Sequence, residues 1–277
     1  MKVSILQMNV RFGEPDANID RMECMLAEQM DRETPDAFVL PELWSTGFYP
    51  KPLESYADRA GERTCELLSR LARKYHVNLV GGSVITSAKG RFHNQCFIFD
   101  REGKQIASYC KTHLFSPAKE EKAFAAGDSL CVFSLDGIRC GMAICYDIRF
   151  PEFIRRLALQ DISVLFVSAA WPVQRTVHWQ TLLRARAIEN QMFVAAANAA
   201  GRQPTMQCAG HSMLIDPWGE VLAEAEAEEI CLSAEMDLSI LQGIRDKINV
   251  FADRRPELYC EILASTSRRR SGSLDFM

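Results

Sequence analysis

The feature that most constrains the fold is a stretch of strand-like runs that follow one another too closely for helices to connect them. Three apolar runs cover 79–85, 94–99 and 105–109, and turn signals separate them at 88–90 and 101–103. Parallel strands need a crossover of about a dozen residues or more, so these runs must pair antiparallel. Any fold of this chain has to accommodate them.

Around this stretch, strand-like and helical segments alternate. We expect strands at 3–8, 38–40, 162–167 and 193–197 and helices at 18–30, 64–75 and 176–190, with a further helix opening at Pro151. A hairpin turns at Asp136-Gly137 between 130–135 and 138–144, and late strands cover 212–215, 220–225 and 230–235. The order predicts a mixed α/β fold in which two sheets pack face to face with helices outside, because one open sheet would be unusually wide.

We predict a single domain over 1–265, since no linker or shift in composition interrupts it, followed by a polar tail at 266–277. The tail contains the cluster Arg268-Arg269-Arg270, to which we assign no function. The net charge of −4 gives no field for gathering phosphates, so nucleic acid is not an expected partner. No run approaches the roughly 18 apolar residues of a membrane span, and the N-terminus resembles a first strand more than a signal peptide. We therefore expect a cytoplasmic protein that does not bind membranes.

Ten cysteines are scattered along the chain without a C-x-x-C pair, and their spacing matches no zinc site. In a cytoplasmic protein they should be reduced thiols, and most should be packing residues. We expect no metal and no organic cofactor.

Three positions could carry chemistry. Cys145 follows an apolar run and precedes a helix, where helix amides and cations would favour a thiolate, although a buried structural cysteine is the alternative. Glu42 follows an apolar strand and a proline, where loss of water would suit a carboxylate that shuttles protons; it could also cap a helix or face solvent. Lys111 ends a strand and could stabilise negative charge on a carbonyl oxygen, or it could simply be solvated.

The three segments around these positions resemble, in the right order, the signature blocks of the nitrilase, or carbon-nitrogen hydrolase, superfamily. They are Pro41-Glu42-Leu43, the run at 109–115 (YCKTHLF) and the run at 141–152 (GMAICYDIRFPE). The resemblance extends over about 1–262 and includes Trp171-Pro172, Arg175, His178-Trp179 and Gly210-His211-Ser212. It implies a four-layer α-β-β-α sandwich and a homodimer.

The resemblance also implies roles for single residues. Cys145 would be the nucleophile, Glu42 the general base, and Lys111 the oxyanion stabiliser together with the backbone N–H of Tyr146. A second glutamate precedes a turn that is Ala126-Gly127 here, which favours Glu120 over the adjacent Glu121. One position departs from the pattern: relatives carry arginine where this chain has Ala199, and we consider Arg202 as its replacement.

The pattern is most similar to the omega-amidase-like branch, which hydrolyses the terminal amide of short dicarboxylic monoamides such as 2-oxoglutaramate or succinamate. Such a substrate needs a cation for its distal carboxylate, and Arg175 is our candidate because arginine binds carboxylates bidentately; a surface arginine is the alternative. Trp171 is either a pocket wall or a core residue.

Several other functions remain open. A papain-like enzyme would need one of the histidines at 76, 93, 113, 178 and 211 as partner of Cys145, yet no papain-type sequence surrounds that cysteine. A catalytically silent nitrilase-fold interaction protein would be expected to lack a triad residue. Deaminated glutathione amidase and N-carbamoyl amide hydrolase are rivals within the family, and a nitrile is the least expected substrate.

Overall fold

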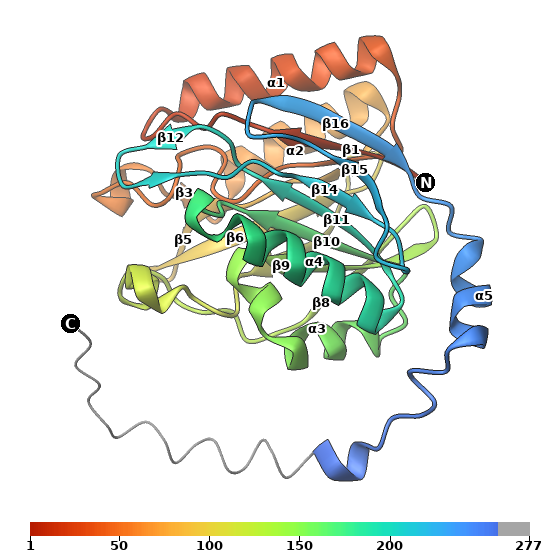
Figure 1. Ribbon diagram of the computed structural model, residues 1–277. Helices are drawn as coiled ribbons and strands as arrows, with labels where there is room; N and C mark the ends of the chain where they lie inside the picture. The colour runs from red at the N-terminus through yellow and green to blue at the C-terminus, as the bar shows by residue number, and fades with distance from the viewer. Residues whose placement is uncertain (260–277) are drawn as a thin grey trace, which may run out of the picture.

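The computed structural model describes residues 1–259 (Figure 1). The domain boundary predicted at 265 and the cluster Arg268-Arg269-Arg270 lie outside the described residues. Within the described part, two large sheets form the centre of the molecule.

The first sheet has eight strands and combines parallel and antiparallel pairs. Its order is β16 (Ile230–Glu235), β1 (Lys2–Gln7), β2 (Ala37–Val39), β4 (Asn78–Val80), β6 (Arg91–Phe99), β5 (Val84–Ala88) and β3 (Asp58–Arg59), with β7 (Gln105–Cys110) also paired to β6. Strands β1, β2 and β4 are parallel, whereas β6 pairs antiparallel with β4, β5 and β7. The antiparallel pairing predicted for this stretch is therefore confirmed.

The strand expected at 79–85 is in fact two strands, β4 and β5, separated by Gly81 and Gly82. Gly82 has φ +61°, a left-handed conformation that suits glycine, and a Cβ there would lie 2.3 Å from the carbonyl oxygen of Pro41. The interruption lets Ser83 bond to the loop that follows β2, because its N–H donates to that same oxygen at 3.1 Å. The break thus brings the chain against the segment that carries Glu42.

The second sheet has six strands in the order β15 (Val221–Glu224), β14 (Met213–Ile215), β11 (Phe193–Asn198), β10 (Val164–Ala169), β9 (Ile138–Ile144) and β8 (Cys131–Leu135). Its centre, β9, β10 and β11, is parallel, and β8 forms the predicted hairpin with β9. These central strands are buried along nearly their whole length, as is typical of parallel strands covered on both faces.

The two sheets pack face to face, and helices cover both outer faces (Figure 1). Helices α1 (Pro15–Arg32) and α2 (Glu62–Tyr75) lie on the first sheet, and α3 (Pro151–Ala158) and α4 (Thr176–Asn190) lie on the second. Alternate residues of β2 show the layering: Val39 belongs to the core between the sheets, whereas Phe38 packs with α1 and α2. The α-β-β-α sandwich is confirmed.

Smaller elements escaped the sequence analysis because their apolar pattern is short. They are α5 (Ile240–Lys247), the short strand β3, the hairpin of β12 (Arg202–Gln203) and β13 (Met206–Gln207), and single 3₁₀ turns at Leu53–Ser55, Ser116–Ala118, Glu120–Lys122, Cys145–Arg149 and Val173–Arg175. Helix α5 buries only Leu241 and Ile244. Over residues 1–259, no helix has the length and apolar character needed to cross a membrane.

Candidate active site

Three of the predicted residues follow strands that end at one edge of the paired sheets. Glu42 comes shortly after β2, Lys111 directly after β7 and Cys145 directly after β9. Strands β2 and β7 run in the same direction, because β7 is antiparallel to β6 and β6 is antiparallel to β4. The carboxyl ends of strands in such sheets are where ligands bind.

Glu42 is buried, and its carboxylate has polar partners on both oxygens. Oε1 accepts from the Nζ of Lys111 at 2.7 Å and from the side-chain N–H of Asn94 at 2.8 Å. Oε2 accepts from the backbone N–H of Ala170 at 2.9 Å. The carboxylate is therefore fixed by hydrogen bonds, in place of the apolar surroundings that the sequence suggested.

Lys111 lies between two carboxylates, and all three side chains are fully buried. Its Nζ is 2.7 Å from Glu42 Oε1 and 2.9 Å from Glu120 Oε2. Burial acts to lower the pKa of Lys111, but the charges of Glu42 and Glu120 outweigh it and hold the pKa above its ordinary value. The lysine therefore stays charged, and its Nζ also donates to Glu120 Oε1 at 3.2 Å.

Glu120, and not Glu121, occupies this cluster. Glu120 is 0% exposed and its Oε2 also accepts from the backbone N–H of Phe115 at 2.6 Å, whereas Glu121 is exposed. The amide of Asn94 donates to Glu42 at 2.8 Å and to Glu120 at 3.3 Å, so one neutral side chain joins two like charges. Among described residues, Asn94 Oδ1 is buried without a hydrogen-bond partner.

Cys145 sits at a sharp turn between β9 and a short 3₁₀ helix, Cys145–Arg149. Its φ of +48° is left-handed, a strained conformation that is found at functional sites. Our expectation of a lowered pKa was wrong. Burial and the negative charge of Glu42 raise the pKa of the Cys145 thiol well above its ordinary value, and the charge of Lys111 only partly opposes them. A thiol with a raised pKa needs a base when it reacts as a nucleophile.

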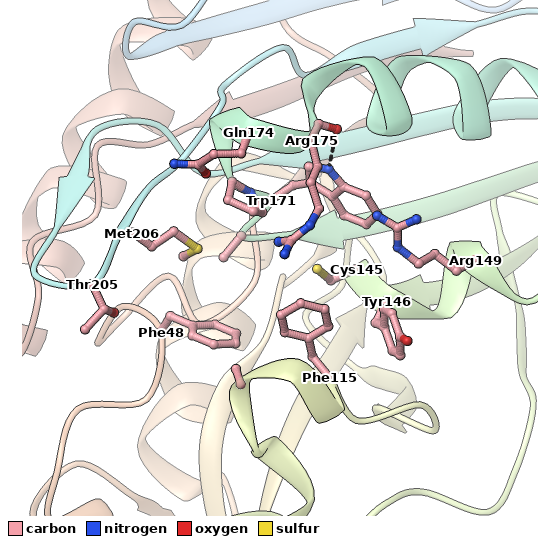
Figure 2. Close-up of a pocket in the computed structure, with 13 residues that line it drawn as sticks. Phe48, Phe115, Cys145, Tyr146, Arg149, Trp171, Gln174, Arg175, Thr205 and Met206 are labelled. Atoms are coloured by element: carbon pink, nitrogen blue, oxygen red, sulfur yellow. Dashed lines mark hydrogen bonds between the residues drawn. The ribbon is translucent and has the colours of Figure 1, made fainter. Parts of the chain in front are cut away.

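The thiol opens onto a cavity of about 380 Å³ (Figure 2). Its wall combines apolar and aromatic side chains with two arginines: Phe48, Phe115, Ala118, Cys145, Tyr146, Arg149, Ala170, Trp171, Pro172, Gln174, Arg175, Thr205 and Met206. A concave, mostly apolar site with a few polar groups is typical of small-molecule binding.

Both arginines of the cavity lack a carboxylate partner among residues 1–259. Figure 2 shows the guanidinium of Arg175 pointing into the cavity, where its centre lies 5.4 Å from the ring of Phe115. Arg149 stacks on Trp171 at 4.7 Å, and burial and the neighbouring charge of Arg175 lower its pKa. Two adjacent unpaired cations can hold an anionic group.

Trp171 serves as both cavity wall and core residue. It is 2% exposed, packs on Trp179 with ring centres 5.5 Å apart and lines the cavity. Its indole N–H donates to the carbonyl oxygen of Arg175 at 2.8 Å, a bond drawn in Figure 2, which fixes the turn that carries this arginine. Arg202, considered as a replacement for the arginine missing at Ala199, is exposed on β12 and does not line the cavity. The arginine that lines the cavity beside Arg175 is Arg149.

None of the five histidines, all within the described range, hydrogen-bonds to Cys145. His113 contacts Asp147, His178 contacts Arg149 and His211 contacts Glu224. His93 contacts a backbone carbonyl and His76 is near Glu102 on the surface. A papain-like pair is therefore wrong for this site.

Within residues 1–259, no group of three or more His, Cys, Asp or Glu side chains is arranged to hold a metal ion.

The sequence analysis missed three residues of the site. Arg149 and Asp147 were quoted inside the signature block without a role, and Asn94 was treated only as the start of a strand. Asn94 and Asp147 are buried polar residues within apolar strand or turn segments, and that combination was the available signal because a buried polar group needs partners.

Comparison with known proteins agrees with this geometry. Residues 2–246 match the family model described as carbon-nitrogen hydrolase. The chain is 43% identical over 257 residues to the 2-oxoglutaramate amidase of Bacillus subtilis, which covers 93% of this chain and 98% of the relative. It is 34% identical to omega-amidase NIT2-A of Xenopus laevis in a match that covers 93% of this chain and 96% of the relative. Among solved structures, Saccharomyces cerevisiae Nit3, a member of branch 10 of the nitrilase superfamily, matches with a TM-score of 0.84 and 27% identity, covering 90% of this chain and 94% of Nit3.

Proposed function

The chain belongs to the carbon-nitrogen hydrolase family, and from that premise we propose that Cys145, Glu42 and Lys111 hydrolyse a small amide through a thioester. The observation that carries the assignment is the convergence of three strand ends on one buried charge cluster that opens, at Cys145, into a cavity. No cofactor takes part in the proposed reaction, because side chains supply nucleophile, base and oxyanion stabiliser.

In the first half of the reaction, the sulfur of Cys145 bonds to the amide carbon while the carboxylate of Glu42 takes the thiol proton. The carbonyl electron pair moves to the oxygen, and the ammonium of Lys111 and the backbone N–H of Tyr146 stabilise this oxyanion. The C–N bond then breaks, and the nitrogen leaves as ammonia with the proton that Glu42 returns. A raised thiol pKa supports this order, since a protonated cysteine needs its base during the attack.

In the second half, a water molecule gives a proton to Glu42 and attacks the thioester carbon. Collapse of the second oxyanion breaks the C–S bond, the sulfur recovers the proton, and the carboxylic acid leaves. Glu120 keeps Lys111 in place between the two carboxylates and balances its charge throughout.

We propose a short dicarboxylic monoamide, of the 2-oxoglutaramate or succinamate type, as the substrate. Two observations support this choice: relatives are named 2-oxoglutaramate amidase and omega-amidase, and Arg175 and Arg149 offer unpaired positive charge beside the thiol. The amide end would lie at Cys145 and the distal carboxylate at the arginines, with Trp171 and Phe115 as walls. Ammonia release from a panel of amides that includes deaminated glutathione and N-carbamoyl compounds distinguishes this substrate class from its rivals.

We also propose a cytoplasmic homodimer with a single domain over 1–265. The family model spans 2–246 without interruption, which supports one domain. Exposed apolar side chains on α4 and on the turn and strand beside it offer a contact surface for a second copy: Val177, Ile188, Trp218 and Leu222. A mass in solution equal to one chain would contradict the dimer.

The decisive experiment for the mechanism is Cys145→Ala, measured by ammonia release. We expect a folded protein without activity, because covalent transfer needs this one thiol. Cys140→Ala and Cys131→Ala are the matched controls, since both thiols are buried in the core and should leave the reaction intact. Ammonia release by Cys145→Ala at the wild-type rate would refute the assignment.

The substrate is tested by comparing 2-oxoglutaramate and succinamate with butyramide, which lacks the carboxylate. A charge-assisted contact is worth about 1.5–3 kcal/mol, so kcat/KM should favour the carboxylate-bearing amides about tenfold to a hundredfold. Arg175→Ala should remove much of this preference, and Arg202→Ala, away from the cavity, should keep it. Equal rates for all three amides would refute the omega-amidase hypothesis but would not contradict the proposed catalytic triad.

A further inference from the structure

We propose that Asp147 is a positioning residue that locks the turn carrying Cys145 to the strand end carrying Lys111. The inference rests on the proposed roles of those two residues. Asp147 itself faces neither the cavity nor the Lys111 cluster, and its side chain is fully buried. Its value to the reaction would lie in the relative placement of nucleophile and cation.

The carboxylate of Asp147 accepts four hydrogen bonds. A carboxylate has about four lone-pair sites, so each of them has a donor. Oδ2 accepts from the backbone N–H of Ile144 at 2.9 Å and from the hydroxyl of Tyr109 at 2.7 Å. Oδ1 accepts from the backbone N–H of His113 at 3.0 Å and from the Nδ1 of the same residue at 2.8 Å. A buried charge with every site satisfied is a rigid connection.

One contact of Asp147 restrains the nucleophile. Ile144 directly precedes Cys145, and the bond from its N–H to Asp147 closes the turn in which Cys145 takes its left-handed conformation. For a residue other than glycine this conformation is unfavourable, so it persists only when the surroundings impose it. Asp147 supplies that restraint from within the turn itself.

The other contacts restrain the cation. Tyr109 and His113 lie two residues before and two residues after Lys111, so Asp147 holds both flanks of the residue. Burial and the charge of Asp147 raise the pKa of Tyr109, so its hydroxyl remains a donor. The His113 ring is stacked on Phe150 with centres 3.8 Å apart, which fixes the side chain that reaches Asp147.

These bonds make one carboxylate the shared anchor of two strand ends from different sheets, β7 and β9. The main charges acting on the thiol are those of Glu42 and Lys111, so Asp147 acts through position. A misplacement of about 1 Å can reduce a rate about a hundredfold even when every reacting group is present. Loss of the anchor should therefore lower kcat and leave KM near its wild-type value, since Asp147 does not itself line the cavity.

Asp147→Asn tests the anchor with the smallest change in shape. The amide must turn its NH₂ toward either Ile144 or His113, and both present N–H donors there, so one side of the connection breaks. We expect kcat for 2-oxoglutaramate to fall about a hundredfold at unchanged KM. The control is Asn78→Ala, which removes a buried side chain with two hydrogen bonds at the opposite edge of the sheet and should lower Tm without changing kcat.

His113 supplies a second test in case Asp147→Asn does not fold. His113→Leu removes the side-chain donor to Oδ1 while the backbone donor remains, and it should lower kcat about tenfold, the effect of about 1.5 kcal/mol for a bond to a charged group. His113→Asn can place its side-chain N–H where Nδ1 lies and should restore most of the rate. All rates are referred to the folded fraction of each variant.

Wild-type kcat in Asp147→Asn, a rise in KM at constant kcat, or equal damage from His113→Leu and His113→Asn would each overturn the proposal. Cys145→Ala, assayed in parallel, distinguishes a failure of the anchor proposal from a failure of the proposed function. If Cys145→Ala is inactive and Asp147→Asn is fully active, only the anchor is wrong. If Cys145→Ala is active, the proposed function fails first.

Discussion

Each end of β2 carries a cation held between two carboxylates, and the two clusters differ in their access to water. Before β2, Arg101 binds Asp36 and Asp136, each at 2.7 Å, and the three side chains are 23%, 42% and 38% exposed. After β2, Lys111 binds Glu42 and Glu120 at 2.7 and 2.9 Å, and all three side chains are 0% exposed. Charge and distances are alike at the two ends.

The difference shows where the molecule tolerates a costly arrangement. Removing three charges from water costs several kcal/mol per ion, and mutual attraction recovers this only with good geometry. The Arg101 cluster avoids that cost by remaining at the surface. The Lys111 cluster accepts it at the edge where Cys145 opens into the cavity, and perturbed buried charges of this kind concentrate at functional sites. We therefore expect substitutions at the buried end to change activity and those at the exposed end to change only stability, and slightly.

The largest difference should separate Glu42→Gln from Asp36→Asn. Glutamine keeps the shape of Glu42 but cannot accept the thiol proton, and general base catalysis contributes about 10²–10⁴ in rate. The raised pKa of Cys145 disfavours the thiolate, so the thiol depends on this base. Asp36→Asn removes a carboxylate of the exposed cluster and should leave kcat unchanged. Steady-state ammonia release measures both, and similar kcat values for the two variants would break the comparison.

Next in size is the pair Lys111→Met and Arg101→Met, which removes the central cation from each cluster. Loss of an oxyanion donor lowers kcat about 10²–10³-fold, and two unpaired buried carboxylates cost about 3–5 kcal/mol of unfolding free energy. Arg101→Met should retain full kcat. Urea denaturation followed by circular dichroism gives the stabilities. A Lys111→Met protein as stable as Arg101→Met would show that the buried cluster is better hydrated than its exposure indicates.

A smaller effect is expected from Glu120→Gln, with Glu121→Gln as the neighbouring control. Glu120 Oε2 accepts from Lys111 and from the backbone N–H of Phe115, and Oε1 accepts from Lys111 at 3.2 Å and from Asn94 at 3.3 Å. An amide has only one acceptor oxygen, so the bonds at one of the two positions are lost. Loss of one bond to a charged group, about 1.5–3 kcal/mol, should lower kcat about tenfold to a hundredfold. Glu121 is exposed, and surface changes stay within about 0.5 kcal/mol. Greater loss from Glu121→Gln would reverse the assignment of the second acid.

Much of this architecture could be predicted from the sequence because it depends on local patterns. Apolar periods placed the strands, and short turns required antiparallel pairing at 79–109. The same reasoning put Glu42, Lys111 and Cys145 at strand ends, where side chains leave the sheet. The one strand that was misjudged, 79–85, is interrupted by Gly81 and Gly82, whose role depends on contact with a distant carbonyl oxygen.

The features that could not be predicted depend on the combined contributions of residues that are far apart in the chain. The direction of the Cys145 pKa shift is the balance of burial against the charges of Glu42, Lys111 and Glu120, and a sequence gives none of these distances. The cavity wall likewise combines Phe48, Phe115 and Met206 from separate loops. Asp147 was invisible as an anchor because two of its partners, Tyr109 and His113, are 38 and 34 positions away in the chain.

The smallest effect should come from the exposed cluster itself, through salt and pH. Arg101 lowers the pKa of Asp136 from the ordinary 3.8 by its hydrogen bonds and charge. A carboxylate with a lowered folded-state pKa stabilises the protein above its unfolded pKa, and this contribution is lost as pH falls through the folded-state value. The stability difference between wild type and Arg101→Met should therefore be largest near neutral pH and disappear as the pH falls through the lowered folded-state pKa of Asp136. Exposed pairs contribute about 0–1 kcal/mol and are screened as the Debye length falls from about 10 Å at 0.1 M salt to about 3 Å at 1 M. Urea melts at both salt concentrations should show the difference shrinking with salt, whereas the cost of Lys111→Met should persist, because no solvent reaches that cluster. A salt-insensitive Arg101→Met difference would mean that the two ends of β2 are energetically alike despite their unequal exposure.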